Sequence, residues 1–258
     1  MSFKTILIEK KDQITKITLN LPEKRNALDM VMRVELLHAM RDISDDEDVK
    51  AVVLTGAGKA FCSGGDLRTM ENLTAVAGRI RMKKGQRLIK AMIELEKPII
   101  AAVNGPAAGP GVSIALASDF LIASESAKFA IPFVKVGLVP DWGLLYFLPL
   151  RIGIARAKEF MILGKTLDAR EADLLGLVNK VVPPEELEGE AFALASKLAK
   201  GPLQCQAMIK SALNHWPASL DSLLEMESSM QAVAFSSEDF IEGRQAFLES
   251  RKPDFKGE

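Results

Sequence analysis

The sequence predicts an α/β fold, and three observations lead to that prediction. Its 258 residues, 48% of them hydrophobic, suit one large α/β domain or a core with a small appendage. Short β-branched runs at 50–55 and 98–102 are typical of buried strands. Each run leads through a glycine-rich turn into a helical pattern, at 59–67 and at 103–119. Such a corner either packs a helix on a sheet or aims backbone N–H groups at a developing negative charge.

The N-terminal part predicts a hairpin followed by a helix. Strands at 5–9 and 14–20 form the hairpin. Asp29 or Asn26 is expected to cap a helix that runs to about Asp45. The apolar side of this helix is expected to hold Met32, Val34, Leu36, Leu37, Met40 and Ile43.

Beyond the first corner the pattern alternates between helical and extended segments. Residues 68–95 form an interrupted helical region whose basic residues face solvent or, alternatively, contact phosphates. Strands are expected at 120–123, 128–131 and 177–182, and helices at 133–137, 144–150, 155–163, from 168, 185–200, 202–215, 220–235 and 238–250. The last helices are more apolar than one monomer surface needs, so they are expected to pack on the core and on another subunit. The predicted division is a core, 1–198, and a C-terminal helical region, 199–258.

Composition excludes several classes of function. A net charge of −1 gives no general attraction to nucleic acid or to an anionic membrane. Cys62 and Cys205 are too few and too far apart for a disulfide framework or a metal-ligand cluster, so no metal is expected. No histidine lies near Cys62 in the sequence, which disfavours it as a nucleophile. Without a signal-peptide pattern or an apolar run of about 20 residues, the chain is expected to be cytoplasmic.

Four motifs carry a resemblance to a known family. They are LPEKRNAL at 21–28, KAFCSGGDL at 59–67, VNGPAAGPGVSIALASD at 103–119 and VGLVPDWG at 136–143. In this order they resemble the crotonase (enoyl-CoA hydratase/isomerase) superfamily, and the site pattern is most similar to its enoyl-CoA isomerase and phenylacetate-pathway isomerase branch. The resemblance extends from about Thr5 to Phe255. It implies a spiral of β-β-α turns with a C-terminal helical trimerisation region, and hence a homotrimer or hexamer.

The resemblance implies an acyl-CoA thioester as substrate, with no separate cofactor because CoA is part of that substrate. The thioester carbonyl would lie between two backbone N–H groups, and Gly65 matches the first donor. The second position falls on Pro110, which has no N–H. Proline suits the first turn of a helix, so the expected replacement is the Gly111 N–H, the helix dipole or a water.

The same resemblance restricts the catalytic acids. Hydratases of the family use two glutamates, whose positions here hold Ser113 and Phe133. Asp141 remains, at the position where the isomerases carry an acid, and one carboxylate is enough to move a proton from C2 to C4. An apolar wall is expected to raise its pKa; the alternative is that Asp141 caps the next helix. This wall is expected to contain Phe133, Leu138, Val139, Trp142 and Leu144.

Further residues are assigned to substrate binding by motif position. Asp66 is expected to be structural, and the basic residue expected after Phe247 falls on Ser250, beside Arg251 and Lys252. The assigned residues are Lys24, Arg25 and Ala27 in the nucleotide loop, Ser63, Gly64, Asp66 and Leu67 at the first corner, Gly109 and Pro110 at the second, Phe133, Leu138 and Trp142 around the acid, and Phe235 and Phe247 in the C-terminal helices.

The favoured function is a shift of the double bond of a 3-enoyl-CoA to give a 2-enoyl-CoA. One alternative is a hydratase for an unusual acyl-CoA that uses Asp141 alone, or a racemase or dienoyl-CoA isomerase variant. The other is a scaffold that binds CoA or RNA without turnover. Pro110 favours the scaffold, whereas the near-neutral charge argues against RNA.

Overall fold

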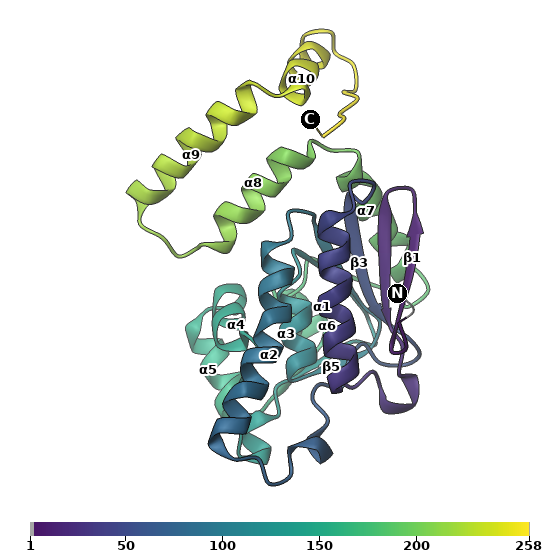
Figure 1. Cartoon of the computed structure of the whole chain (residues 1–258), viewed down its shortest axis with the longest axis vertical. Coiled ribbons are helices and arrows are strands. Elements are labelled where there is room, and N and C mark those ends of the chain that lie inside the picture. The colour runs from purple at the N-terminus through teal and green to yellow at the C-terminus, as the bar shows by residue number, and fades with distance from the viewer. Residues whose placement is uncertain (1–2, 258) are drawn as a thin grey trace.

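The computed structural model describes residues 3–257 and shows a six-stranded sheet covered by helices on both faces (Figure 1). The strand order is β1-β2-β3-β4-β6-β9. β1 and β2 form the expected antiparallel hairpin, and every later neighbour in this sheet pairs in parallel. The strands of this sheet are β1 (Ile6–Lys11), β2 (Ile14–Leu19), β3 (Ala51–Gly56), β4 (Ile99–Val103), β6 (Phe120–Ser124) and β9 (Lys180–Val182).

A second, three-stranded sheet was not expected from the sequence. It has the order β5-β7-β8, with β5 (Pro106–Ala108), β7 (Lys128–Ala130) and β8 (Thr166–Asp168). Because β4 is followed by β5 and α3, and β6 by β7 and η3, the chain repeats a strand-strand-helix turn. This repeat confirms the spiral of β-β-α turns.

The helices lie close to their expected ranges. Asp29, rather than Asn26, caps α1, where it accepts hydrogen bonds from two backbone N–H groups. The strand expected at 177–182 is shortened to β9, because Asn179 instead bonds the Leu121 N–H through its side chain. The helices are η1 (Pro22–Lys24), α1 (Met30–Asp45), η2 (Leu67–Met70), α2 (Ala75–Glu94), α3 (Pro110–Leu116), η3 (Phe133–Val136), α4 (Leu144–Ile152), α5 (Ile154–Leu163), α6 (Ala169–Leu174), α7 (Leu187–Ala199), α8 (Leu203–Asn214), α9 (Leu220–Phe235) and α10 (Glu238–Leu248).

Two hydrophobic clusters hold the layers together. The larger cluster lies between one face of the sheet and α1, α2 and α3, and the smaller one lies between the other face and α7. The apolar side expected for α1 is wrong at one position, because Val34 is 46% exposed while the neighbouring Arg33 is buried. A charged side chain is thus turned toward the interior.

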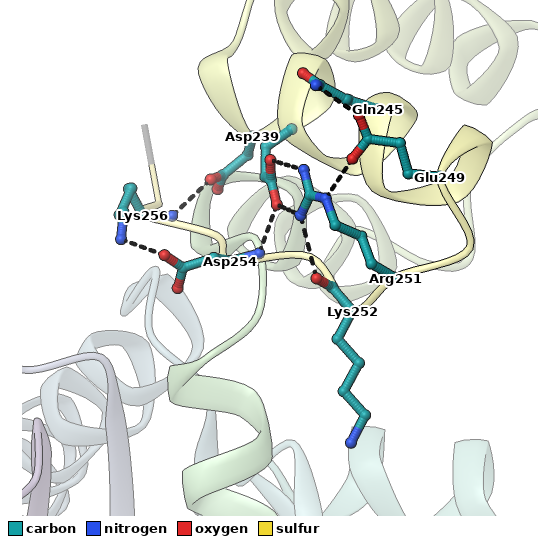
Figure 2. A network of polar contacts seen from close by, with 8 residues as sticks. Asp239, Gln245, Glu249, Arg251, Lys252, Asp254 and Lys256 are labelled. Atoms are coloured by element: carbon teal, nitrogen blue, oxygen red, sulfur yellow. Dashed lines mark hydrogen bonds and ion pairs between the residues drawn. The ribbon is translucent and has the colours of Figure 1, made fainter.

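Helices α9 and α10 extend away from the rest of the chain and lie at the opposite end of the view from β5 (Figure 1). Helix α8 is bonded to the core, because Lys210 pairs with Asp119 and Asn214 donates to the Ile93 carbonyl. Figure 2 shows how the segment after α10 is tied to that helix: Arg251 pairs with Glu249, and Asp239 accepts from the Lys256 N–H. Arg251 also pairs with Glu242, and the Gly257 N–H also donates to Asp239. Several large apolar side chains remain exposed on these helices, among them Leu213, Leu220, Val233, Phe235, Ile241, Phe247 and Leu248. No helix of the described residues has both the length and the apolar character needed to span a lipid bilayer.

Candidate active site

The two glycine corners lie against each other. The Ala108 N–H donates to the Cys62 carbonyl at 2.9 Å, and Cys62 bridges to Ala107 as a parallel strand pair would. A Cβ on Gly64 would lie 2.5 Å from the Ala108 oxygen and 3.2 Å from Pro110 Cδ, so only glycine allows this approach. The two corners therefore pack directly on each other, and whether their N–H groups meet at one oxygen atom stays a prediction.

The backbone donors at the corners differ in their availability. Within residues 3–257, neither the Gly65 N–H nor the Gly111 N–H has a hydrogen-bond partner. The Gly109 N–H is used, because it donates to the Ala130 carbonyl at 3.0 Å. Pro110 begins α3 at the position where a missing N–H costs nothing. Gly65 and Gly111 remain as the donors available to an anionic oxygen.

Asp141 lies beside the second corner. The Ser113 hydroxyl, fully buried on α3, donates to the Asp141 backbone carbonyl at 3.1 Å. Burial raises the pKa of the Asp141 carboxyl to about 6, and the positive charges of Arg33 and Arg81 oppose that rise. Its Oδ1 is buried and has no hydrogen-bond partner in the described structure. A carboxyl in this condition is suited to take up and release a proton near neutral pH.

The alternative role of Asp141 as a helix cap is wrong. Gly143 occupies the cap position of α4 and supplies no side chain, while the Asp141 backbone carbonyl accepts the Leu144 N–H. Phe133, at the position of a family glutamate, is buried, and its ring lies 3.3 Å from a Cβ placed on Gly109. Neither Ser113 nor Phe133 supplies an acid.

The expected apolar wall is formed only in part. Trp142 is 1% exposed, and a Cβ on Gly85 of α2 would lie 2.5 Å from its indole ring, so α2 has a glycine there for a steric reason. Leu138 and Val139 do not join it, because their side chains are 44% and 77% exposed. The desolvation of Asp141 therefore comes from the interior side, from Trp142 and the elements packed on it.

Arg33 is the site residue that sequence reasoning missed. Its guanidinium carbon lies 5.0 Å from the centre of the Trp142 ring, and its Nε donates to the Leu28 carbonyl at 2.9 Å. Burial lowers the pKa of Arg33 to about 10, and the Arg81 charge contributes to that shift. The available signal was an arginine among the apolar positions of α1, next to Met32 and within one turn of Leu36.

Most of the residues assigned to the nucleotide loop and to the first corner lie around one cleft. A cleft of about 410 Å³ is lined by the predicted residues of the 23–27 loop and of the first corner. Asp66 caps η2 and pairs with Arg68, as expected of a structural residue. Buried Asn26 ties the loop to the corner by donating to the Ala57 and Ala60 carbonyls. The predicted residues in this cleft are Lys24, Arg25, Ala27, Ser63, Gly65, Asp66 and Leu67.

Two aromatic residues do not reach the corners within one chain. Phe235 and Phe247, on α9 and α10, are 57% and 83% exposed. Arg251, a candidate for the basic contact after Phe247, is occupied by its pairs with Glu242 and Glu249. The assignment of these aromatic residues to substrate binding stays a prediction.

Other chemistries find little support. Cys62 is fully buried, and desolvation raises the pKa of its thiol to about 12, so it is not a nucleophile at neutral pH. Among residues 3–257 no group of three or more His, Cys, Asp or Glu side chains is placed to hold a metal ion.

Comparison with known proteins identifies the class of protein, an acyl-CoA enzyme of the crotonase fold. Residues 9–258 match the family model described as enoyl-CoA hydratase/isomerase, so the chain belongs to that family. It is 36% identical to crotonyl-CoA hydratase from Syntrophomonas wolfei over 99% of both chains, and 38% identical to 1,2-epoxyphenylacetyl-CoA isomerase from Escherichia coli over 95% of both.

A solved structure agrees with this assignment. Enoyl-CoA hydratase from Bacillus anthracis superposes with a TM-score of 0.94 at 34% identity, over 99% of this chain and 100% of the other. Most of the similar relatives are named hydratases, and the E. coli protein is named an isomerase. The family is thereby established, whereas the reaction within the family is a separate question.

Proposed function

We propose that this enzyme moves the double bond of a 3-enoyl-CoA to the 2-position, with Asp141 as its one proton carrier. The observation that carries the proposal is the buried, unpartnered carboxyl oxygen of Asp141, in a part of the described structure where Ser113 and Phe133 provide no second acid. Hydration by the family's two-glutamate route needs both acids.

The chemistry follows from the placement of these groups. Ionised Asp141 takes a proton from C2, and negative charge accumulates on the thioester oxygen as the enolate forms. The N–H groups of Gly65 and Gly111 hold that oxygen, and each oriented donor lowers such a barrier by roughly 3 kcal/mol. Protonated Asp141 then returns the proton to C4 on the same face. No water is consumed, in keeping with a carboxyl that is desolvated by burial.

The runner-up is hydration of an unusual acyl-CoA by Asp141 alone. The names of most similar relatives favour it. In that case Asp141 would activate a water molecule instead of moving a substrate proton. The two reactions differ in their substrates and in whether oxygen is added to the product.

The test supplies 3-hexenoyl-CoA and crotonyl-CoA separately to the purified protein and to its Asp141→Asn variant. We expect conversion of 3-hexenoyl-CoA to 2-hexenoyl-CoA, little hydration of crotonyl-CoA, and at least about a hundredfold loss of kcat in the variant. Exposed Asp42→Asn, on α1, serves as the matched control and should retain wild-type activity. Rapid hydration of crotonyl-CoA with 3-hexenoyl-CoA left unchanged would refute the isomerase.

A further inference from the structure

Buried polar atoms without partners gather around Asp141. Six buried side-chain polar atoms in the described part of the chain lack a hydrogen-bond partner, and four of them belong to Asp141 and its neighbours: the donors Arg33 Nη1, Arg81 Nε and Trp142 Nε1 and the acceptor Asp141 Oδ1. The other two are Thr15 Oγ1 and Gln206 Oε1. Leaving such a group unpaired costs about 1–3 kcal/mol, so several in one place indicate a polar ligand that satisfies them together.

The four groups form one cluster. Arg33 lies over the Trp142 ring at 5.0 Å, and the charges of Arg33 and Arg81 both act on Asp141. The cluster reaches the first corner, because a Cβ on Gly65 would lie 3.6 Å from Arg33 Nη2 and 3.0 Å from Met70 Cε. It therefore lies beside Gly65, the residue at which the thioester would be held.

Both arginines are fixed in place and have unused donors. Arg33 is only 6% exposed and is held by Nε on the Leu28 carbonyl. Arg81, on α2, is held by Nη2 on the Thr69 hydroxyl at 2.8 Å. Of the ion pairs found between residues 3 and 257, none involves either guanidinium. Two held guanidinium groups with free N–H donors match the geometry of a carboxylate.

We propose that Arg33 and Arg81 recognise a carboxylate on the acyl group, so that the substrate is the CoA monothioester of an unsaturated dicarboxylic acid. A hydrocarbon tail would leave the free N–H groups of both arginines unpaired, whereas a carboxylate offers acceptors for them. The positive charges of Arg33 and Arg81 repel each other, and an anion between them relieves that repulsion. The proposal rests on the proposed function for the position of the thioester at Gly65.

In the competing role, Arg33 donates a hydrogen bond to the thioester oxygen itself, in place of the backbone N–H that Pro110 lacks. This role makes a different prediction. A donor to the thioester oxygen assists every acyl-CoA equally, whereas a receptor for a distal carboxylate distinguishes thioesters with that group from those without it.

The experiment measures binding and turnover with matched pairs. Calorimetry compares the Kd of adipoyl-CoA with that of hexanoyl-CoA, which has a methyl group in place of the carboxylate, and of the neutral adipoyl-CoA methyl ester. Turnover compares 3-hexenedioyl-CoA with 3-hexenoyl-CoA. We expect the free carboxylate to bind at least about tenfold more tightly than either neutral thioester, and to raise kcat/KM by a similar factor.

Variants locate the effect. Arg33→Met should abolish the preference, Arg33→Lys should keep part of it, and Arg41→Met, a matched change of an exposed arginine on α1, should leave it unchanged. If Arg33→Met does not fold, Arg81→Met gives the same test. The inference is overturned if the wild type binds adipoyl-CoA and the neutral thioesters equally. It is also overturned if Arg33→Met loses the same factor of kcat with 3-hexenedioyl-CoA and with 3-hexenoyl-CoA and still prefers the carboxylate. A preference in Kd without isomerisation of either thioester sustains it and refutes the proposed function.

Discussion

Replacing Asp141 by asparagine should make the folded protein more stable while abolishing its activity. Burial raises the pKa of Asp141 from an ordinary 3.8 to about 6. The ionised form of Asp141 is therefore disfavoured in the folded state. This lowers the free energy of unfolding in full above the pKa of the folded protein, and not at all well below the pKa of the unfolded chain. A shift of about 2 units corresponds to about 3 kcal/mol at pH 7.5, and neutral asparagine of similar shape removes it.

The assay is urea unfolding at pH 7.5 and at pH 4. At pH 7.5 the variant should gain up to about 3 kcal/mol in free energy of unfolding, whereas at pH 4 the gain should fall to about 0.5 kcal/mol because the folded wild type is then protonated. The control Asp42→Asn, on the surface, should change stability by no more than about 0.5 kcal/mol at either pH. A variant that is equal to or less stable than the wild type at pH 7.5 would show that Asp141 is not desolvated as described.

The remaining predictions concern the same site and its supports. The kcat/KM for 3-hexenoyl-CoA should fall tenfold per pH unit below about 6, because Asp141 must be ionised to take the C2 proton; a profile flat from pH 7 to pH 5 would contradict this. Gly85→Ala should destabilise the protein by about 1–3 kcal/mol in urea unfolding, since its Cβ would meet the Trp142 ring, whereas Ala substitution at Gly78 of the same helix, where a Cβ would meet nothing within 4 Å, should not. Asp239→Ala should release the C-terminal tail, seen as faster amide exchange at Lys256 and Gly257; unchanged exchange would show that other contacts hold the tail.

Much of the fold could be predicted from the sequence, because the local sequence patterns favour the same helices and strands that the tertiary packing requires. The hairpin, the longer strands and most helices follow from apolar periodicity and from caps such as Asp29. Strands β5 and β8 have three residues each, too few for periodicity to distinguish them from loops. Their pairing through β7 exists only once the spiral brings them together.

Site residues that belong to a sequence motif were predicted, whereas a residue whose burial is decided by tertiary packing was missed. Glycine positions located both corners, and Asp141 followed from the resemblance. Arg33 was missed because helical periodicity does not decide between Arg33 and Val34 for the buried direction. The difference lies in Trp142, whose ring accepts the guanidinium only after α1, α2 and the loop before α4 have assembled.

The most direct test of the central claim traces oxygen and hydrogen in the product. The enzyme is incubated with 3-hexenoyl-CoA in deuterated water enriched in oxygen-18, and the isolated acyl-CoA is analysed by mass spectrometry and NMR. A single carboxyl that carries the C2 proton to C4 predicts 2-hexenoyl-CoA with no oxygen-18 at C3, any deuterium confined to C2 or C4, and loss of both conversion and exchange in Asp141→Asn. A product that carries oxygen-18 at C3, or deuterium exchange that persists in Asp141→Asn, would contradict it.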